Sequence, residues 1–184
     1  MPAWVDESVN VRLGVYLLCA YTCTSDQENL ARTSLANSPL GQRRRFHWRN
    51  EKEELRIAAR DLIATLPGGL VIVIGTGLVN SRQERARQVC FRQLLLHLDN
   101  RGVGDIVLER RDPHLNRRDI RTLEGLRGAG WIRAVAHVSH GDPNVDEMLW
   151  IADAVCGLSS RALGTDFEDL SVLARTHVIR IPVT

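Results

Sequence analysis

The stretch PAWVDESVNVRLGVYLLCAYTC, residues 2–23, indicates how the chain begins to fold. Apolar, β-branched and aromatic residues occupy its two ends, and a polar segment from Asp6 to Asn10 separates them. This pattern is typical of two short strands joined by a turn. We therefore expect an antiparallel β-hairpin to open the protein.

Helical and strand patterns alternate after the hairpin. Helices are expected over 25–41 and 50–66, over 80–102 with a capping box from Ser81 to Glu84, over 116–130, and from Asn144 and Glu147 onward. Strands are expected over 70–75, 105–109, 132–138 and 176–183. The order predicts an α/β fold with a mixed sheet, an antiparallel opening hairpin and flanking helices.

Length and composition set the class of protein. The chain has 184 residues, of which 44% are hydrophobic, and nothing resembling a linker divides it, so we expect a single domain over 1–184. The longest apolar runs are too short to span a bilayer and no secretory signal follows Met1, which favours a soluble, cytoplasmic protein. The four cysteines lack zinc-site spacing and are expected to be buried.

The stretch EMLWIADAVCG, residues 147–157, poses the main chemical question. Apolar residues cover most of this expected helix, yet Asp153 lies in its middle. A buried carboxylate must be paired, protonated or bound to a cation, because an unpaired buried charge costs several kcal/mol.

Three acidic positions are candidates for one cluster. Asp6, with Glu7 beside it, is expected to end the first strand, Glu109 ends the strand over 105–109, and Asp153 lies in the late helix. Two strand ends and a facing helix can bring these carboxylates together, and Mg²⁺ or Mn²⁺ prefers such hard oxygen ligands. Glu7 or Asp112 would be a fourth ligand. In the alternative interpretation, Asp153 is paired with an arginine, and Asp6 and Glu109 are ordinary turn and cap residues.

Arginines lie close in the sequence to His47 and to Glu109. Lys52 is the only lysine, and the net charge is only +2. His47 could orient a phosphate or donate a proton, or it could simply pack between Phe46 and Trp48. The arginines expected to hold nucleic-acid phosphates, unless they are merely solvated, are Arg43, Arg44, Arg45, Arg110, Arg111, Arg117 and Arg118.

The motifs WVDES at 4–8, RFHW at 45–48 and LWIADAVCG at 149–157 together resemble an uncharacterised family of ribonuclease H-like proteins from bacteria and phages. That family opens with an Asp-Glu-Ser-Gly strand and closes with a Gln-Leu-Ala-Asp-Leu-type helix. The resemblance covers about residues 3–160, and the matching residues are Asp6, Glu7, Ser8, His47, Ala152 and Asp153, with Glu109 where the family commonly has aspartate. Val9 and Trp150 depart from the usual glycine and glutamine.

The resemblance implies a ribonuclease H-like fold and site. Together with the carboxylates, it leads to the hypothesis of a metal-dependent phosphodiesterase that cleaves DNA or RNA, with Mg²⁺ or Mn²⁺ held by Asp6, Glu109 and Asp153. Glu7 and His47 would assist catalysis. The alternative function is a non-catalytic binding or partner-interaction module of the same fold. A nuclease requires the three carboxylates to converge on a shared ion, whereas a binding module does not.

Overall fold

A six-stranded sheet forms the centre of the computed structural model, which describes residues 1–164 and 175–183. The strand order is β5-β4-β1-β2-β3-β6. The strands are β1 (Pro2–Asn10), β2 (Val15–Thr22), β3 (Gly69–Thr76), β4 (Asp105–Glu109), β5 (His137–Gly141) and β6 (Thr176–Pro182). β1, β2 and β3 form an antiparallel meander, while β4 and β5 run parallel to β1 and β6 runs parallel to β3. The expected mixed sheet with an antiparallel opening is confirmed.

The opening hairpin is longer than predicted. β1 and β2 pair along their whole lengths, with Asp6 opposite Cys19 and Asn10 opposite Val15. The turn lies at residues 11–14, where Gly14 has a φ of 62°. The predicted turn from Asp6 to Asn10 is therefore wrong, because these polar residues belong to a strand that continues beyond its apolar half.

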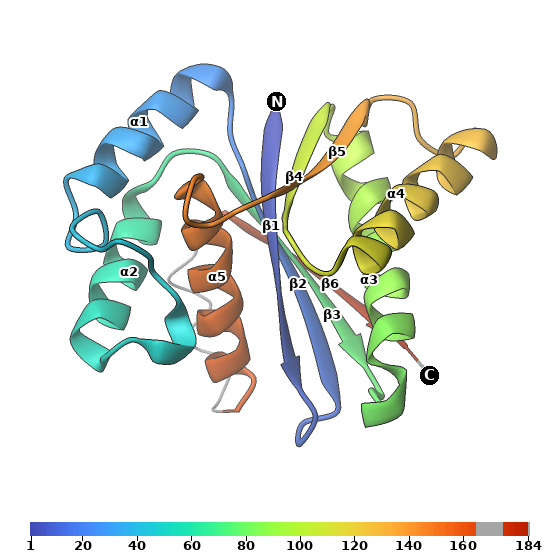
Figure 1. The fold of residues 1–184 in the computed structure, drawn as a ribbon, viewed down its shortest axis with the longest axis horizontal. Coiled ribbons are helices and arrows are strands. Elements are labelled where there is room, and N and C mark those ends of the chain that lie inside the picture. The colour runs from blue at the N-terminus through green and yellow to red at the C-terminus, as the bar shows by residue number, and fades with distance from the viewer. Residues whose placement is uncertain (165–174, 184) are drawn as a thin grey trace.

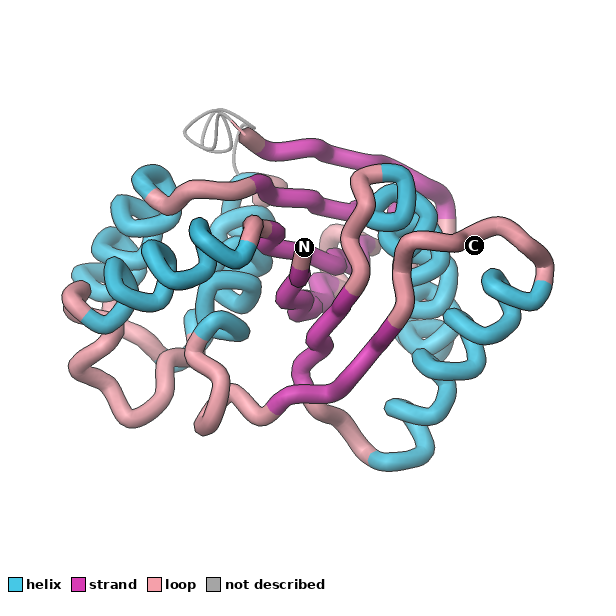
Figure 2. The backbone as a smooth tube through the Cα atoms, turned by 90° about the horizontal axis from the view of Figure 1, so that it is seen from above, coloured by secondary structure: helices cyan, strands magenta, loops and turns pink. Residues whose placement is uncertain are grey.

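Two groups of helices cover the sheet, one on each face. The helices are α1 (Ser25–Ala36), α2 (Glu53–Thr65), α3 (Gln83–Asn100), α4 (Pro113–Gly128) and α5 (Met148–Ala162), with short 3-10 helices η1 (Trp48–Asn50) and η2 (Asn80–Arg82). Figure 1 shows α1, α2 and α5 on one side of the strands and α3 and α4 on the other, and Figure 2 shows the sheet between these layers from above.

Each face of the sheet has its own hydrophobic core. In β2, Leu17, Cys19 and Tyr21 pack toward α5, whereas Leu18 and Ala20 pack toward α3. This alternation follows from the two-residue period of a strand. β2 and β3 are buried along nearly their whole length because both faces are covered, as expected for β3. None of the described helices combines the length and apolar composition that a membrane span requires.

Three predicted boundaries differ from the structure. The capping box from Ser81 to Glu84 does not form, since α3 begins after η2 without a side-chain cap. Residues 133–135 are not in a strand, because their amide groups donate to the carboxylate of Asp99. Asn144 does not cap α5, because its side chain donates to Asp142, while Asp146 accepts the amide proton of Met148.

Candidate functional site

The candidate site lies where β1 and β4 separate. The two strands pair only from Pro2 opposite Asp105 to Val5 opposite Leu108. Asp6 and Glu109 are the next residues on each strand, so they leave the ladder at the same level. β1 stays extended beyond this point because β2 pairs with it. A cavity of about 230 Å³ opens here, lined by both carboxylates together with His47, Arg110 and parts of the neighbouring strands.

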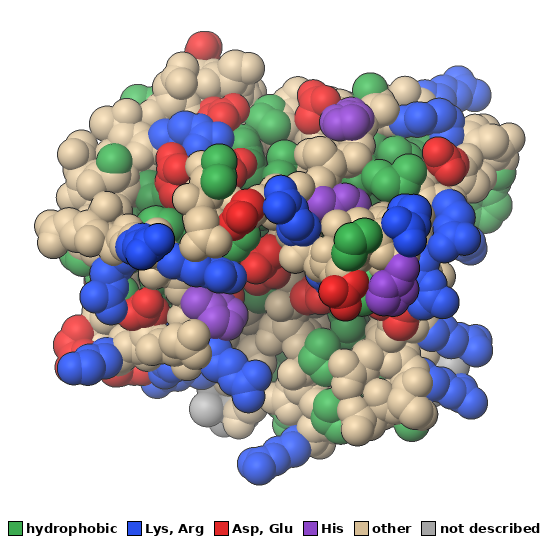
Figure 3. Space-filling view, in the orientation of Figure 1, with side chains coloured by type: hydrophobic (Ala, Val, Ile, Leu, Met, Phe, Trp, Pro, Cys, Tyr) green, Lys and Arg blue, Asp and Glu red, His purple; other side chains and the backbone are tan. Residues whose placement is uncertain are grey.

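Helix α5 brings the third carboxylate to this place. It packs directly on β1, and the thiol of Cys156 lies 3.1 Å from the carbonyl oxygen of Asp6. Asp153, almost one turn earlier on α5, is only 8% exposed. Figure 3 shows acidic side chains near the middle of this face of the molecule, with basic side chains on either side. The structure thus brings Asp6, Glu109 and Asp153 together, from a strand, a strand end and a helix.

The carboxylate of Asp153 holds the segment before α2 in place. Its Oδ2 accepts the backbone amide proton of Trp48 at 2.7 Å and lies 3.1 Å from Nδ1 of His47. Among the described residues its hydrogen bonds involve Oδ2 alone and no arginine is paired with it. The contacts of Asp153 in the described residues are thus to a histidine and a backbone amide, and not to the arginine of the alternative interpretation.

Gly157 provides the space for this arrangement. A Cβ atom at this position would lie 2.1 Å from Cγ of Trp48, so the indole ring occupies the place of the missing side chain. Arg56 secures the other side of the ring, with its Nε donating to the carbonyl oxygen of Trp48 at 3.0 Å and its guanidinium 5.6 Å from the ring centroid. The neighbouring His47 is held at the cavity with 44% of its side chain exposed, so it is accessible to a ligand.

Repulsion and burial act on all three carboxylates. Burial, followed by the charges of Asp153 and Glu109, raises the pKa of Asp6 well above its ordinary value. Burial also raises the pKa of Glu109, opposed by Arg45 and increased further by Asp153. For Asp153, burial raises the pKa although the Trp48 amide and His47 oppose it. The three groups therefore favour sharing a proton or binding a cation over carrying three charges.

The donor set suits a hard divalent cation. It consists of carboxylate oxygens whose mutual repulsion such an ion would relieve, as Mg²⁺ and Mn²⁺ require. In the ranges 1–164 and 175–183, however, no three His, Cys, Asp or Glu side chains are arranged as a ready coordination sphere. One reason is visible: Arg45 pairs with Glu109 at 3.2 Å, and Oδ2 of Asp153 is already hydrogen-bonded. The chemistry of the donors fits, and side-chain rotation would be needed to use it.

Glu7 and Asp112, the candidates for a fourth ligand, differ in their position relative to the cavity. Glu7 faces the opposite side of β1 from Asp6, where it accepts a hydrogen bond from Tyr16 and pairs with Arg87. Asp112 is exposed at the start of α4 and does not line the cavity. Glu7 therefore lines the same cavity as Asp6 and Glu109 but is paired with Arg87, whereas Asp112 lies outside that cavity.

A buried ionic network behind the cavity was not anticipated. Arg87 is 2% exposed and Asp119 is 1% exposed; they form a bidentate pair at 3.2 and 2.9 Å. Arg111 also contacts Asp119, at 3.3 Å, and His140 lies 3.1 Å from it. Burial would raise the pKa of Asp119, but these partners lower it to about 2. The sequence carried a signal for the pair, because each residue falls on the apolar stripe of its helix.

The arginines predicted to bind phosphates divide into three groups. Arg43 pairs with Glu51 at 2.8 Å and Arg45 with Glu109, yet both side chains are about half exposed. Exposed arginines without a recorded ion pair in the described ranges are Arg44, Arg110 and Arg117, and Arg118 is 3.8 Å from Glu84. Arg111 is different, since its guanidinium binds Glu84 and Asp119 and its side chain is only 16% exposed. It is committed to the network and is not presented to a phosphate backbone.

Comparisons with known proteins bear on the fold. No family model matches the sequence, and no curated protein is similar to it. A solved structure, that of RNase HII in its complex with PCNA from Archaeoglobus fulgidus, is similar over 93% of this chain and 75% of that chain, with a TM-score of 0.50 and 16% sequence identity. At this identity the likeness concerns the fold, which is ribonuclease H-like as the sequence predicted.

Proposed function

We propose that this protein is a divalent-cation-dependent phosphodiesterase that acts on nucleic acid. One observation carries the proposal: Asp6, Glu109 and Asp153 converge where β1 and β4 separate, and the first of them is repelled by the other two. The similar structure is named as a ribonuclease, which supports the choice of nucleic acid. A partly buried cluster of like charges destabilises the fold, so its presence is best explained by a ligand that uses it.

The residues in and beside the cavity would have separate roles. Asp6, Glu109 and Asp153 would hold Mg²⁺ or Mn²⁺, and the bound ion would supply Lewis-acid polarisation of a phosphoryl oxygen. Half-exposed His47 is placed to orient a phosphate or to donate a proton to a leaving oxygen. Arg45, which pairs with Glu109 at 3.2 Å, would exchange this carboxylate for a phosphate group.

The test combines calorimetric Mn²⁺ binding with cleavage of labelled single-stranded DNA, single-stranded RNA and RNA–DNA hybrid. Asp6→Asn and Glu109→Gln should each abolish both signals while leaving the metal-free protein folded, because each change removes a repelled charge. Asp105→Asn is the matched control, since Asp105 is exposed at the opposite end of β4. It should behave as the wild type.

Two outcomes would contradict the proposal. If the site variants bind Mn²⁺ and cleave as well as Asp105→Asn does, the carboxylates are not the metal site. If the wild type binds nucleic acid but neither Mn²⁺ nor Mg²⁺, the binding module is the better description. The hydrogen bonds that Asp153 makes to His47 and Trp48 would then be its whole role.

A further inference from the structure

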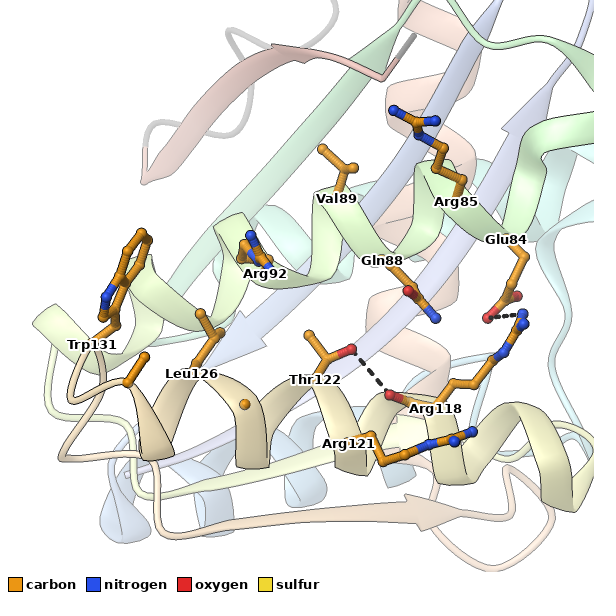
Figure 4. A pocket seen from close by; sticks show the side chains of 12 residues that line it. Glu84, Arg85, Gln88, Val89, Arg92, Arg118, Arg121, Thr122, Leu126 and Trp131 are labelled. Carbon is orange, nitrogen blue, oxygen red and sulfur yellow. Dashed lines mark hydrogen bonds and ion pairs between the residues drawn. The ribbon is translucent and has the colours of Figure 1, made fainter.

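A second surface outside the carboxylate cavity has features of a ligand site. A groove of about 930 Å³ runs between α3 and α4. We call it the α3/α4 groove. Val89, Leu126 and Ala129 contribute apolar surface to it, and Gly125 leaves its middle open, because a Cβ there would meet nothing within 4 Å. Figure 4 shows Trp131 at one end of the groove and the pair formed by Glu84 and Arg118 at the other.

The groove is strongly basic. Four arginines line it, Arg85, Arg92, Arg118 and Arg121, against the single acidic residue Glu84. Glu84 is already neutralised, since Arg111 binds it at 3.0 Å. Within the residues that the structure describes, Arg85, Arg92 and Arg121 have no recorded ion pair. A row of arginines without carboxylate partners is complementary to a polyanion.

An exposed tryptophan specifies the kind of polyanion. Trp131 is 61% exposed, whereas the other three tryptophans of the chain are buried or half-buried. A nucleobase can stack on such a ring only when it is unpaired, and arginines beside an aromatic platform are the usual elements of single-strand binding. An acidic peptide would need the arginines but would leave the ring unused.

The size and position of the groove agree with a short segment of single-stranded nucleic acid. From Arg118 on α4 to Ala129 at its C-terminal cap there are eleven residue steps, which correspond to roughly 16 Å, or about five nucleotides at a stacked spacing of 3.4 Å. Glu84 also connects the groove to the carboxylate cavity, because its partner Arg111 lines that cavity together with Glu109.

We infer that the α3/α4 groove binds a single-stranded segment of nucleic acid, with its phosphates on the arginines and one base stacked on Trp131. The inference extends the proposed function, because it takes nucleic acid as the ligand and places part of it outside the cleavage site. It does not require a divalent cation, so it is tested without one.

The experiment measures anisotropy of a labelled oligothymidine of about 15 nucleotides, roughly three times the length of the groove, in EDTA. Gly125→Glu places a charged side chain in the groove and should weaken binding at least tenfold. Its matched control is Gly128→Glu, which adds the same charge three residues later, also in open space but outside the groove lining. This control should bind within about twofold of the wild type.

Two further variants separate the ring from the charges. Trp131→Leu should weaken binding at least about fivefold, while Trp131→Phe should retain most of it, because base–aromatic stacking requires a ring. Replacing Arg85, Arg92 and Arg121 together by alanine should flatten the dependence of log affinity on log salt by about two units, since each phosphate contact on a single strand contributes about 0.7.

Several results would overturn the inference. It fails if the wild type does not bind the oligonucleotide, or if Gly125→Glu binds it as well as Gly128→Glu does. It also fails if polyglutamate competes as effectively as unlabelled oligothymidine, which would indicate an acidic protein partner. None of these measurements depends on cleavage. Failure of the groove inference would therefore not contradict the proposed nuclease site. Loss of Mn²⁺ binding in the carboxylate variants would likewise not contradict the groove inference.

Discussion

Replacing Gly157 by alanine should disrupt the candidate site from a distance. The new methyl carbon would lie 2.1 Å from Cγ of Trp48, whereas ordinary contacts begin near 3.4 Å, so the ring must withdraw by about 1.3 Å. A matching shift of the backbone would stretch the 2.7 Å hydrogen bond from Trp48 to Asp153 to about 4 Å, beyond bonding range. The carboxylate would then lose one of the two groups that stabilise its charge.

The expected cost combines three effects. Overpacking costs about 1–3 kcal/mol, and loss of a hydrogen bond to a charged group costs about 1.5–3 kcal/mol. Alanine in place of a helical glycine returns about 1 kcal/mol. We therefore expect Gly157→Ala to lower the free energy of unfolding by about 1.5–5 kcal/mol.

Urea denaturation followed by circular dichroism measures this change, and Gly125→Ala is the matched control. Gly125 is also helical, but a Cβ there meets nothing within 4 Å, so this variant should be as stable as the wild type or more stable. In a Trp48→Ala background, Gly157→Ala should lose its penalty, because the clash is gone. If Gly157→Ala is as stable as Gly125→Ala, the indole ring of Trp48 does not pack against Gly157. In that case α5 does not hold His47 in place.

Two other substitutions test the network and the basic segment. Asp119→Asn should destabilise the protein by about 1.5–3 kcal/mol at neutral pH, because it removes one of the two carboxylates that pair with buried Arg87. Because the pKa of Asp119 is lowered to about 2, its ionised form contributes stability that is present above pH 4 and is lost as the pH falls toward 2. In acid denaturation followed by fluorescence, the stabilities of the wild type and the variant should therefore converge near pH 2. Replacing the arginines at 43–45 together by alanine should reduce nucleic-acid affinity and flatten its salt dependence, measured by anisotropy between about 50 and 200 mM salt, and an unchanged slope would make them solvated surface residues.

The sequence predicted the grouping of the carboxylates better than their local structure. Asp6 was expected at a strand end, yet it lies within β1, and it is the partner strand β4 that ends beside it. The inference still led to the right neighbours, because pairing between Val5 and Leu108 puts the next residue of each strand at one level. Hydrophobic pattern defines which residues are strand, but it does not define where a neighbouring strand stops pairing.

Contacts between loops and helices that are far apart in the chain could not be predicted from the sequence. The hydrogen bond from the Trp48 amide to Asp153 joins residues separated by 105 positions and involves a backbone group, which no side-chain pattern announces. The sequence around Gly157 likewise does not indicate that the indole of Trp48 packs against this position. Arg87, by contrast, could have been found, because it precedes Cys90, Phe91 and Leu94 at helical spacing on one buried face. A charge on such a face requires a partner.

The alternation of side chains along β1 joins the cavity to the network behind it. Asp6 faces α5 and the carboxylate cluster, while Glu7 faces α3 and Arg87, so adjacent residues belong to opposite layers of the molecule. The strand between them cannot shift on one side without moving the other. Arg111 closes the connection, because it lines the cavity, pairs with buried Asp119 and binds Glu84 at the end of the α3/α4 groove. A ligand in that groove that displaced Glu84 would leave the partly buried guanidinium of Arg111 with one partner fewer, in the cavity that Glu109 also lines. This gives the groove a physical route to the carboxylates without any contact between the two sites.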